Sequence, residues 1–168
     1  MIERGVLNKD DHVELIRGEI VQKDPKTHRH AWCVTNLSYL SRNLLDQEVI
    51  IWNQNAVIVG ESEPEPDIVL LKYSERFYSD RRPVVSDVLL IGEVADITLA
   101  ADREVKIPLY AAAGIPEAWI VNLEDDVIEV YSAPANGAYQ KTWIAGKGST
   151  VSLPAGLPGV VSVDEVLS

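Results

Sequence analysis

The sequence predicts a mixed α/β (α+β) fold in which helices flank a central mixed β-sheet, with an N-terminal β-hairpin before it and a C-terminal β meander after it. Two observations support this prediction. Helical spacing alternates with short apolar, strand-like runs over residues 28–121, whereas residues 127–153 hold strand-like runs separated by turn residues. A helix, a run of strands, a second helix and a further strand form a layered α/β arrangement.

The hairpin is predicted near the start of the chain. Residues 12–16 and 19–23 have the composition of strands, and Arg17-Gly18 between them is a plausible two-residue turn. Pairing around this turn puts Glu14 and Glu19 on the same face of the hairpin.

The first helix is expected from about residue 28 to Gln47, with Thr27 as its N-cap. Four apolar side chains on it follow helical spacing: Cys33, Leu37, Leu40 and Leu44. His30 lies seven residues before Leu37 and falls on the same stripe, so we expect it to point toward the core near the helix start.

The rest of the chain supplies the sheet and a second helix. The predicted strands are 48–52, 56–59, 67–71, 88–93, 118–121, 127–131, 139–143 and 150–153. A helix should begin after Thr98 and run to about Ala113, where Gly114 is a natural C-terminal cap, and Pro108 should kink it or mark its first turn. Residues 72–86 are expected to form a polar loop or short helix that covers a site.

Two acids mark the ends of predicted strands. Asp67 begins one strand, and Glu93 ends a buried apolar strand 26 positions later. A buried carboxylate is costly without a partner. If the two strands are neighbours, like charges force one acid to take up a proton unless a cation neutralises both. This is the physical argument for a divalent metal, Mg²⁺ or Mn²⁺, held by Asp67 and Glu93 with the backbone carbonyl of Val94 as a further ligand.

Three further groups are candidates for the same chemistry. Lys106 belongs to the series Asp102, Lys106 and Tyr110, which are four residues apart and share one helical face. Its ammonium would orient the attacking water or neutralise a phosphate. His30 would act as a base or phosphate contact. Glu14 or Glu19 would supply an outer carboxylate, and Glu19 is preferred because it flanks the turn.

Each candidate has a structural alternative. Under this alternative, Asp67, which follows Pro66, only begins a strand or caps a turn. Lys106 likewise only makes an ordinary surface pair with Asp102. His30 on an apolar stripe is then a satisfied core histidine. Both hairpin acids are then solvated. Glu93 is the strongest candidate, because an acid within so apolar a strand needs a partner.

Composition and charge set further bounds. The length of 168 residues suits a single domain over 1–168, and the single cysteine, Cys33, cannot form an intrachain disulfide. Residues 1–11 lack the apolar core of a signal peptide and no run approaches membrane-spanning length, so we expect a cytoplasmic protein with no membrane partner.

The net charge of −11 argues against non-specific wrapping of nucleic acid. A bound metal and a local basic patch can still dominate the field inside a cleft. The candidate patches are Lys23, Lys26, His28, Arg29 and His30, and the pair Arg81-Arg82.

Several ordered motifs carry a resemblance over almost the whole chain. They are 14–20 (ELIRGEI), the helix with His30, 66–68 (PDI), 93–96 (EVAD), 102–106 (DREVK) and 110–121 (YAAAGIPEAWIV). Together they resemble the Uma-type restriction-endonuclease-like family of the PD-(D/E)xK nuclease superfamily.

The resemblance implies a restriction-endonuclease-like core, a Mg²⁺-type metal at paired acids, and action on nucleic acid, with DNA as the expected substrate. By motif, Asp67 corresponds to the PD aspartate and Glu93 to the acid of the (D/E)xK element. Ala95 stands where that element has its lysine. Lys106 matches the migrated lysine that this family carries on the following helix.

Two functions therefore stay open. One is a Mg²⁺-dependent endonuclease that hydrolyses phosphodiester bonds. The other is a catalytically silent, nuclease-like domain that acts as a dimeric interaction module, as the acidic surface and Ala95 suggest. We expect a homodimer, because apolar strand faces near the C-terminus, including Val160-Val161 and Val166-Leu167, need covering.

Overall fold

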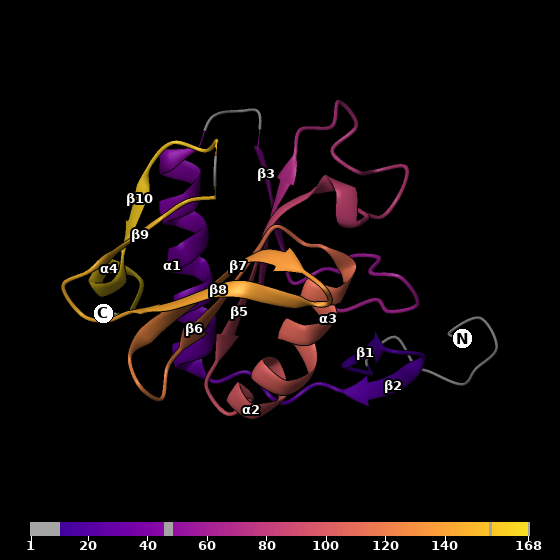
Figure 1. The fold of residues 1–168 in the computed structure, drawn as a ribbon, viewed down its shortest axis with the longest axis horizontal. Coiled ribbons are helices and arrows are strands. Elements are labelled where there is room, and N and C mark those ends of the chain that lie inside the picture. Colours follow the sequence, from indigo (N-terminus) through magenta and orange to yellow (C-terminus); the bar gives the residue numbers. More distant parts are fainter. Residues whose placement is uncertain (1–10, 46–48, 155, 168) are drawn as a thin grey trace.

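The computed structural model describes residues 11–45, 49–154 and 156–167 and centres on a six-stranded mixed β-sheet (Figure 1). In spatial order its strands are β3 Val49–Asn53, β4 Ile68–Lys72, β5 Val88–Ala95, β6 Glu117–Asn122, β7 Val127–Ala135 and β8 Ala138–Ala145. β5 and β6 are parallel, and the other neighbours are antiparallel. The mixed α+β class and the central mixed sheet are thus confirmed.

Helical segments cover both faces of the sheet. One face packs against α1 His28–Leu44 together with β9 Thr150–Ser152, β10 Val160–Ser162 and α4 Val163–Leu167. The other face packs against a continuous helical segment made of α2 Leu99–Ala101, the π-helical turn η3 Asp102–Lys106 and α3 Ile107–Ala113. Figure 1 shows α1 and α3 on opposite sides of the sheet. This second segment is the crossover that a parallel β5–β6 pair requires.

β5 is apolar along almost its whole length because both of its faces are buried. Leu90 and Val94 belong to the core beneath α1, whereas Ile91 and Ala95 belong to the core beneath α3. Glu93 lies between Ile91 and Ala95 in the alternation, so it points toward the crossover segment.

The N-terminal elements follow the sequence predictions. The hairpin consists of β1 Val13–Ile16 and β2 Glu19–Gln22, with Ile16 opposite Glu19. The Thr27 side chain accepts a hydrogen bond from the His30 amide at 3.1 Å, which confirms Thr27 as the N-cap of α1. The predicted helix end at Gln47 and strand start at Glu48 lie outside the described residues.

Two predicted strands are wrong. Residues 56–59 form only isolated bridges, Ile58 with Val84 and Val59 with Ser62, because the proline-rich connector that follows cannot continue a ladder. Val166 and Leu167 are helical in α4, where Val163 and Val166 are both buried at helical spacing.

The segment 72–86 is a loop that ends at the 3₁₀ turn η2 Val85–Asp87. It packs beside β3, with the Tyr78 ring against Trp52, and supplies no lining residue to the pocket described below. In the described part of the chain, no helix combines the length and apolarity needed to cross a bilayer.

Candidate active site

Asp67 and Glu93 face each other across two antiparallel strands. Ile68 pairs with Gly92, and one further step along this register places Asp67 opposite Glu93. Directly opposed residues have Cβ atoms roughly 5 Å apart. Asp67 is 7% exposed and Glu93 is 3% exposed. The prediction that neighbouring strands bring these two acids together is therefore confirmed by the sheet.

Asp67 is surrounded by hydrogen-bond donors. Its Oδ2 accepts from His30 Nε2 at 3.0 Å and from the Val94 amide at 2.9 Å, and its Oδ1 accepts from Gln54 Nε2 at 3.4 Å. Burial acts to raise the pKa of Asp67, but the hydrogen bonds from His30 and Val94 outweigh it and lower the pKa below its ordinary value. Asp67 is thus held ionised, and His30 points inward as predicted.

Glu93 lies in the opposite electrostatic situation. Its Oε1 accepts from the Tyr110 hydroxyl at 2.5 Å, and its Oε2 accepts from Lys106 Nζ at 3.2 Å. Burial raises the pKa of Glu93 to about 8 even though the Lys106 ammonium opposes the rise, and the negative charges of Asp102 and Asp67 add to it. Between pH 4.5 and 8 Glu93 therefore favours its protonated form unless a further cation stabilises its charge.

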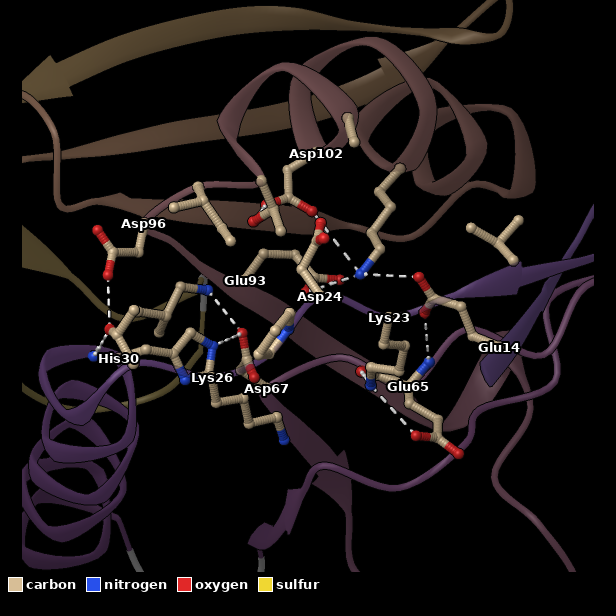
Figure 2. A pocket seen from close by; sticks show the side chains of 18 of the residues that line it. Glu14, Lys23, Asp24, Lys26, His30, Glu65, Asp67, Glu93, Asp96 and Asp102 are labelled. Atoms are coloured by element: carbon tan, nitrogen blue, oxygen red, sulfur yellow. Dashed lines mark hydrogen bonds and ion pairs between the residues drawn. The ribbon is translucent and has the colours of Figure 1, made fainter. Parts of the chain in front are cut away.

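Lys106 lies among three carboxylates. Its Nζ is 3.2 Å from Glu93 Oε2, 3.3 Å from Glu14 Oε1 and 3.7 Å from Asp102 Oδ1. Burial acts to lower the pKa of Lys106, but these acids outweigh it and raise the pKa. Figure 2 shows Glu14, Glu93 and Asp102 converging from the hairpin, the sheet and the crossover segment. Lys106 is thus a buried cation at the centre of an acidic cluster.

The π-helical turn sets the position of Asp102 and Lys106. The Ile107 amide donates to the Asp102 carbonyl, and the Thr98 hydroxyl donates to Asp102 Oδ2 at 2.7 Å. The predicted helix over 98–113 has the correct bounds, but it is not a single α-helix. Pro108, which lacks an amide donor, falls in the first turn of α3, directly after the π-helical hydrogen bond. Such π-turns are frequent at functional sites.

A second buried acid anchors this turn to the sheet. Arg103 pairs with Glu129 through two hydrogen bonds, one of them from Nε to Oε2 at 3.1 Å. Glu129 on β7 also accepts from Asn122 at 3.0 Å and from Tyr131 at 2.6 Å. The sequence prediction missed this cluster, although Glu129 carries the same signal as Glu93, an acid within an apolar strand.

The acids line a pocket of about 130 Å³ that also receives Lys23, Lys26 and His30. Of the two hairpin acids, Glu14 lines this pocket, whereas Glu19 is exposed and lies outside it. The preference for Glu19 thus does not match the structure. Both acids share one face of the hairpin, but only β1 turns that face toward the crossover segment, while β2 is exposed along its length.

Three arginines among the basic candidates, Arg29, Arg81 and Arg82, lie outside the pocket. Arg29 pairs with Asp126 and donates to the Leu123 carbonyl, away from the pocket. Arg81 pairs with Asp87 at 2.6 Å, and Arg82 pairs with Glu63. These arginines serve local ion pairs.

The donor set fits a hard divalent cation. Within the described ranges no group of three or more histidine, cysteine or acidic side chains is arranged to hold an ion by itself. Mg²⁺, however, is typically bound through one or two carboxylates together with water and substrate phosphate. Asp67 and Glu93, which lie opposite each other on neighbouring strands, would supply these carboxylates. Val94 donates its amide to Asp67, and its carbonyl stays a predicted ligand.

The sheet, the crossover and the paired strand-end acids define a restriction-endonuclease-like domain. The chain belongs to the Uma2 family, described as "Putative restriction endonuclease", whose model matches residues 2–165. This confirms the resemblance found in the sequence. No curated protein matches the chain.

A solved structure supports the same fold. It is described as "a putative nuclease belonging to DUF820" from Anabaena variabilis and superposes with a TM-score of 0.73 at 14% identity. The match covers 98% of this chain and 94% of the other. At this identity the likeness concerns the fold.

Proposed function

We propose that the protein is a cytoplasmic, Mg²⁺- or Mn²⁺-dependent endonuclease that hydrolyses phosphodiester bonds in DNA. One observation carries the proposal. Asp67 and Glu93 lie opposite each other on neighbouring strands, both are buried, and the Lys106 ammonium contacts Glu93. Two carboxylates can hold a metal that activates water for phosphodiester hydrolysis, and a nearby lysine can neutralise charge on the phosphate.

The roles follow from the contacts. Asp67 and Glu93 would hold the ion, with the Val94 carbonyl as a further ligand. When bound, a divalent ion supplies a water of lowered pKa and neutralises charge on the phosphate. His30 and the Val94 amide keep Asp67 ionised and fix its orientation. Lys106 would stabilise the negative charge that develops on the phosphate oxygens, because its buried ammonium lies beside Glu93.

The direct test compares Asp67→Asn and Glu93→Gln with the matched control Glu75→Gln, an exposed acid in the loop 72–86. Cleavage of plasmid and oligonucleotides is measured with Mg²⁺ and with Mn²⁺, and Mn²⁺ binding is measured by calorimetry. Both site variants should lose cleavage by about 10²-fold or more and bind Mn²⁺ weakly, while the control matches wild type. Wild-type cleavage by both site variants would defeat the proposal.

The silent-module alternative has its own support. Ala95 is fully buried in the core beneath α3, and Lys106 already neutralises part of the acidic cluster. A silent domain predicts that Mn²⁺ neither binds the wild-type protein nor supports cleavage. The same calorimetric titration therefore separates the two functions.

A homodimer is part of the same proposal. Of the C-terminal residues on which this prediction rested, Val161 and Val166 are buried, whereas Val160 is exposed. The edge strand β8 exposes Trp143 and Ile144 and, among the residues that the structure describes, pairs with a strand on one side only. Size-exclusion chromatography with light scattering should give the mass of a dimer for wild type, and a Trp143→Lys variant should shift it toward the monomer. A monomeric wild-type protein contradicts this part of the proposal.

A further inference from the structure

The mouth of the acidic pocket carries exposed apolar side chains from two elements. Val21 on β2 is 39% exposed, and Ile97 in the loop between β5 and α2 is 63% exposed. Both line the pocket that contains Asp67 and Glu93. An exposed isoleucine is unremarkable alone, but apolar residues that border a charged site offer surfaces that an apolar group of a ligand can contact.

The acids lie below this rim. Asp67, Glu93, Asp102 and Glu14 are all buried, so a phosphate that reaches them must pass between the hairpin and the loop with Ile97. Duplex DNA is stiff over the length of one binding site and presents its phosphates on the outside of a paired rod. An unpaired strand bends freely and can insert a single phosphate into such a pocket.

The charge around the mouth of the pocket limits how many phosphates of a nucleic-acid backbone the pocket can bind. Lys26 lines the pocket and donates no hydrogen bond to any residue that the structure describes, whereas Lys23 Nζ is held by Glu65 at 3.1 Å. Asp24, Glu65 and Asp96 line the same mouth and repel further phosphates. Contact with one or two phosphates is therefore favoured, in agreement with the net charge of −11.

We propose that the site takes an unpaired nucleic-acid strand, with bases against Val21 and Ile97 and an adjacent phosphate at Lys26. This inference rests on the proposed nuclease function and names its substrate class. Each unpaired base presents an open apolar face, which exposed apolar side chains can contact. The chemistry recognised is a phosphate with a free base beside it, which DNA and RNA strands share.

The test uses binding in Ca²⁺, which fills hard-oxygen sites, followed by cleavage in Mg²⁺. The probes are a fluorescein-labelled DNA strand of mixed sequence, an RNA strand of the same sequence, and the DNA strand annealed to its complement. At least one single strand should bind about tenfold or more tightly than the duplex and be cleaved faster. Comparison of the two single strands identifies the preferred sugar.

Salt dependence measures the number of phosphate contacts. Each contact on a single strand contributes a slope of about −0.7 to the logarithm of the binding constant against the logarithm of the salt concentration. Two contacts give a slope of about −1.4, and Lys26→Gln should lower its magnitude by about 0.7. Lys147→Gln, in the exposed turn after β8, is the control and should leave the slope unchanged.

The apolar rim is tested by Ile97→Ser, with Val160→Ser on β10 as the control for loss of an exposed apolar side chain. Ile97→Ser should weaken binding of the single strand about fivefold without changing its salt slope, because no charge is removed. Duplex binding or cleavage equal to or better than that of both single strands overturns the substrate class while leaving the nuclease proposal intact. Absence of metal-dependent cleavage on every probe defeats the nuclease proposal itself.

Discussion

Lys106 Nζ lies 3.2 Å from Glu93 Oε2, although the lysine comes from the crossover segment and the acid from the sheet. In the parent motif the lysine would stand two residues after the acid, where this chain has Ala95. Ala95 shares the face of Glu93 on β5 and is fully buried beneath α3. The crossover segment, rather than β5 itself, therefore supplies the ammonium on this face of the sheet.

Replacing Lys106 by methionine should expose the electrostatic role of its ammonium. The change leaves Glu14, Glu93 and Asp102 without their shared cation, so we expect a loss of about 3–5 kcal/mol in the free energy of unfolding in chelator. Mn²⁺ should recover a larger part of this loss in the variant than it adds to wild type, because the metal then supplies the missing positive charge.

Thermal unfolding with and without Mn²⁺ measures this effect. Lys147→Met removes an exposed lysine and should behave as wild type in both conditions. An equal Mn²⁺ shift in wild type and Lys106→Met would show that the metal does not interact with the cluster that Lys106 neutralises.

Glu93 should make the metal-free protein less stable at higher pH. Burial raises its folded-state pKa from the ordinary 4.5 to about 8, so between these values the folded protein keeps a proton that the unfolded chain has released. The folded state then binds more protons, and the free energy of unfolding falls as the pH rises from about 4.5 to 8. Glu93→Gln removes this contribution.

At pH 8 in chelator we expect Glu93→Gln to be more stable than wild type by about 1–3 kcal/mol, or roughly 3–10 °C. The difference should shrink toward pH 5. Urea unfolding across this range tests the sign, and parallel stability curves for the two proteins would contradict it. The same variant should lose metal binding, as expected where function requires a destabilising group.

The sequence predicts the site well wherever the signal is local. Asp67 and Glu93 stand at the ends of apolar runs. The spacing from Asp102 through Lys106 to Tyr110 puts all three on one face, as the contacts of Lys106 with Asp102 and of Lys106 and Tyr110 with Glu93 confirm. The pairing of β4 with β5 is a non-local property. It follows from the order of elements and the family resemblance rather than from either strand.

The missed features depend on tertiary contacts. The π-turn differs from an α-helix by one hydrogen-bond step, and the Arg103–Glu129 pair that holds it joins residues 26 positions apart. Glu14 and Glu19 have equal standing in the hairpin pattern, and only the docking of β1 against the crossover selects Glu14. Residues 56–59 have the composition of a strand, but Val57 and Val59 are buried without a ladder.

The Arg103–Glu129 pair should hold the π-turn in place for Lys106. Arg103→Met leaves Glu129 buried with only neutral donors, so we expect a loss of about 2 kcal/mol in stability, reduced because Arg103 is partly exposed. Cleavage should fall about tenfold as the turn shifts. Arg76→Met, which breaks an exposed pair with Asp80, should change stability by less than about 0.5 kcal/mol.

The double variant Arg103→Met/Glu129→Leu distinguishes electrostatic from positional effects. Removing both charges should restore much of the stability, because no buried charge is left unpaired. Cleavage should stay low, since the anchor of the turn is still missing. Full recovery of cleavage in the double variant would show that Lys106 needs no such anchor.

Gly92 should be required for the close approach of β4 and β5 beside the two acids. A Cβ at this position would lie 2.6 Å from Ile68 Cγ2, and Ile68 is itself buried and paired with Gly92. Gly92→Ala should therefore cost about 1–3 kcal/mol of stability and weaken Mn²⁺ binding by displacing Glu93 from Asp67. Ile68→Ala in the same chain removes the clashing methyl group, so a double-mutant cycle in urea should give a favourable coupling of about 1 kcal/mol or more. Strictly additive effects of the two substitutions would show that the strands accommodate the extra methyl group without this contact.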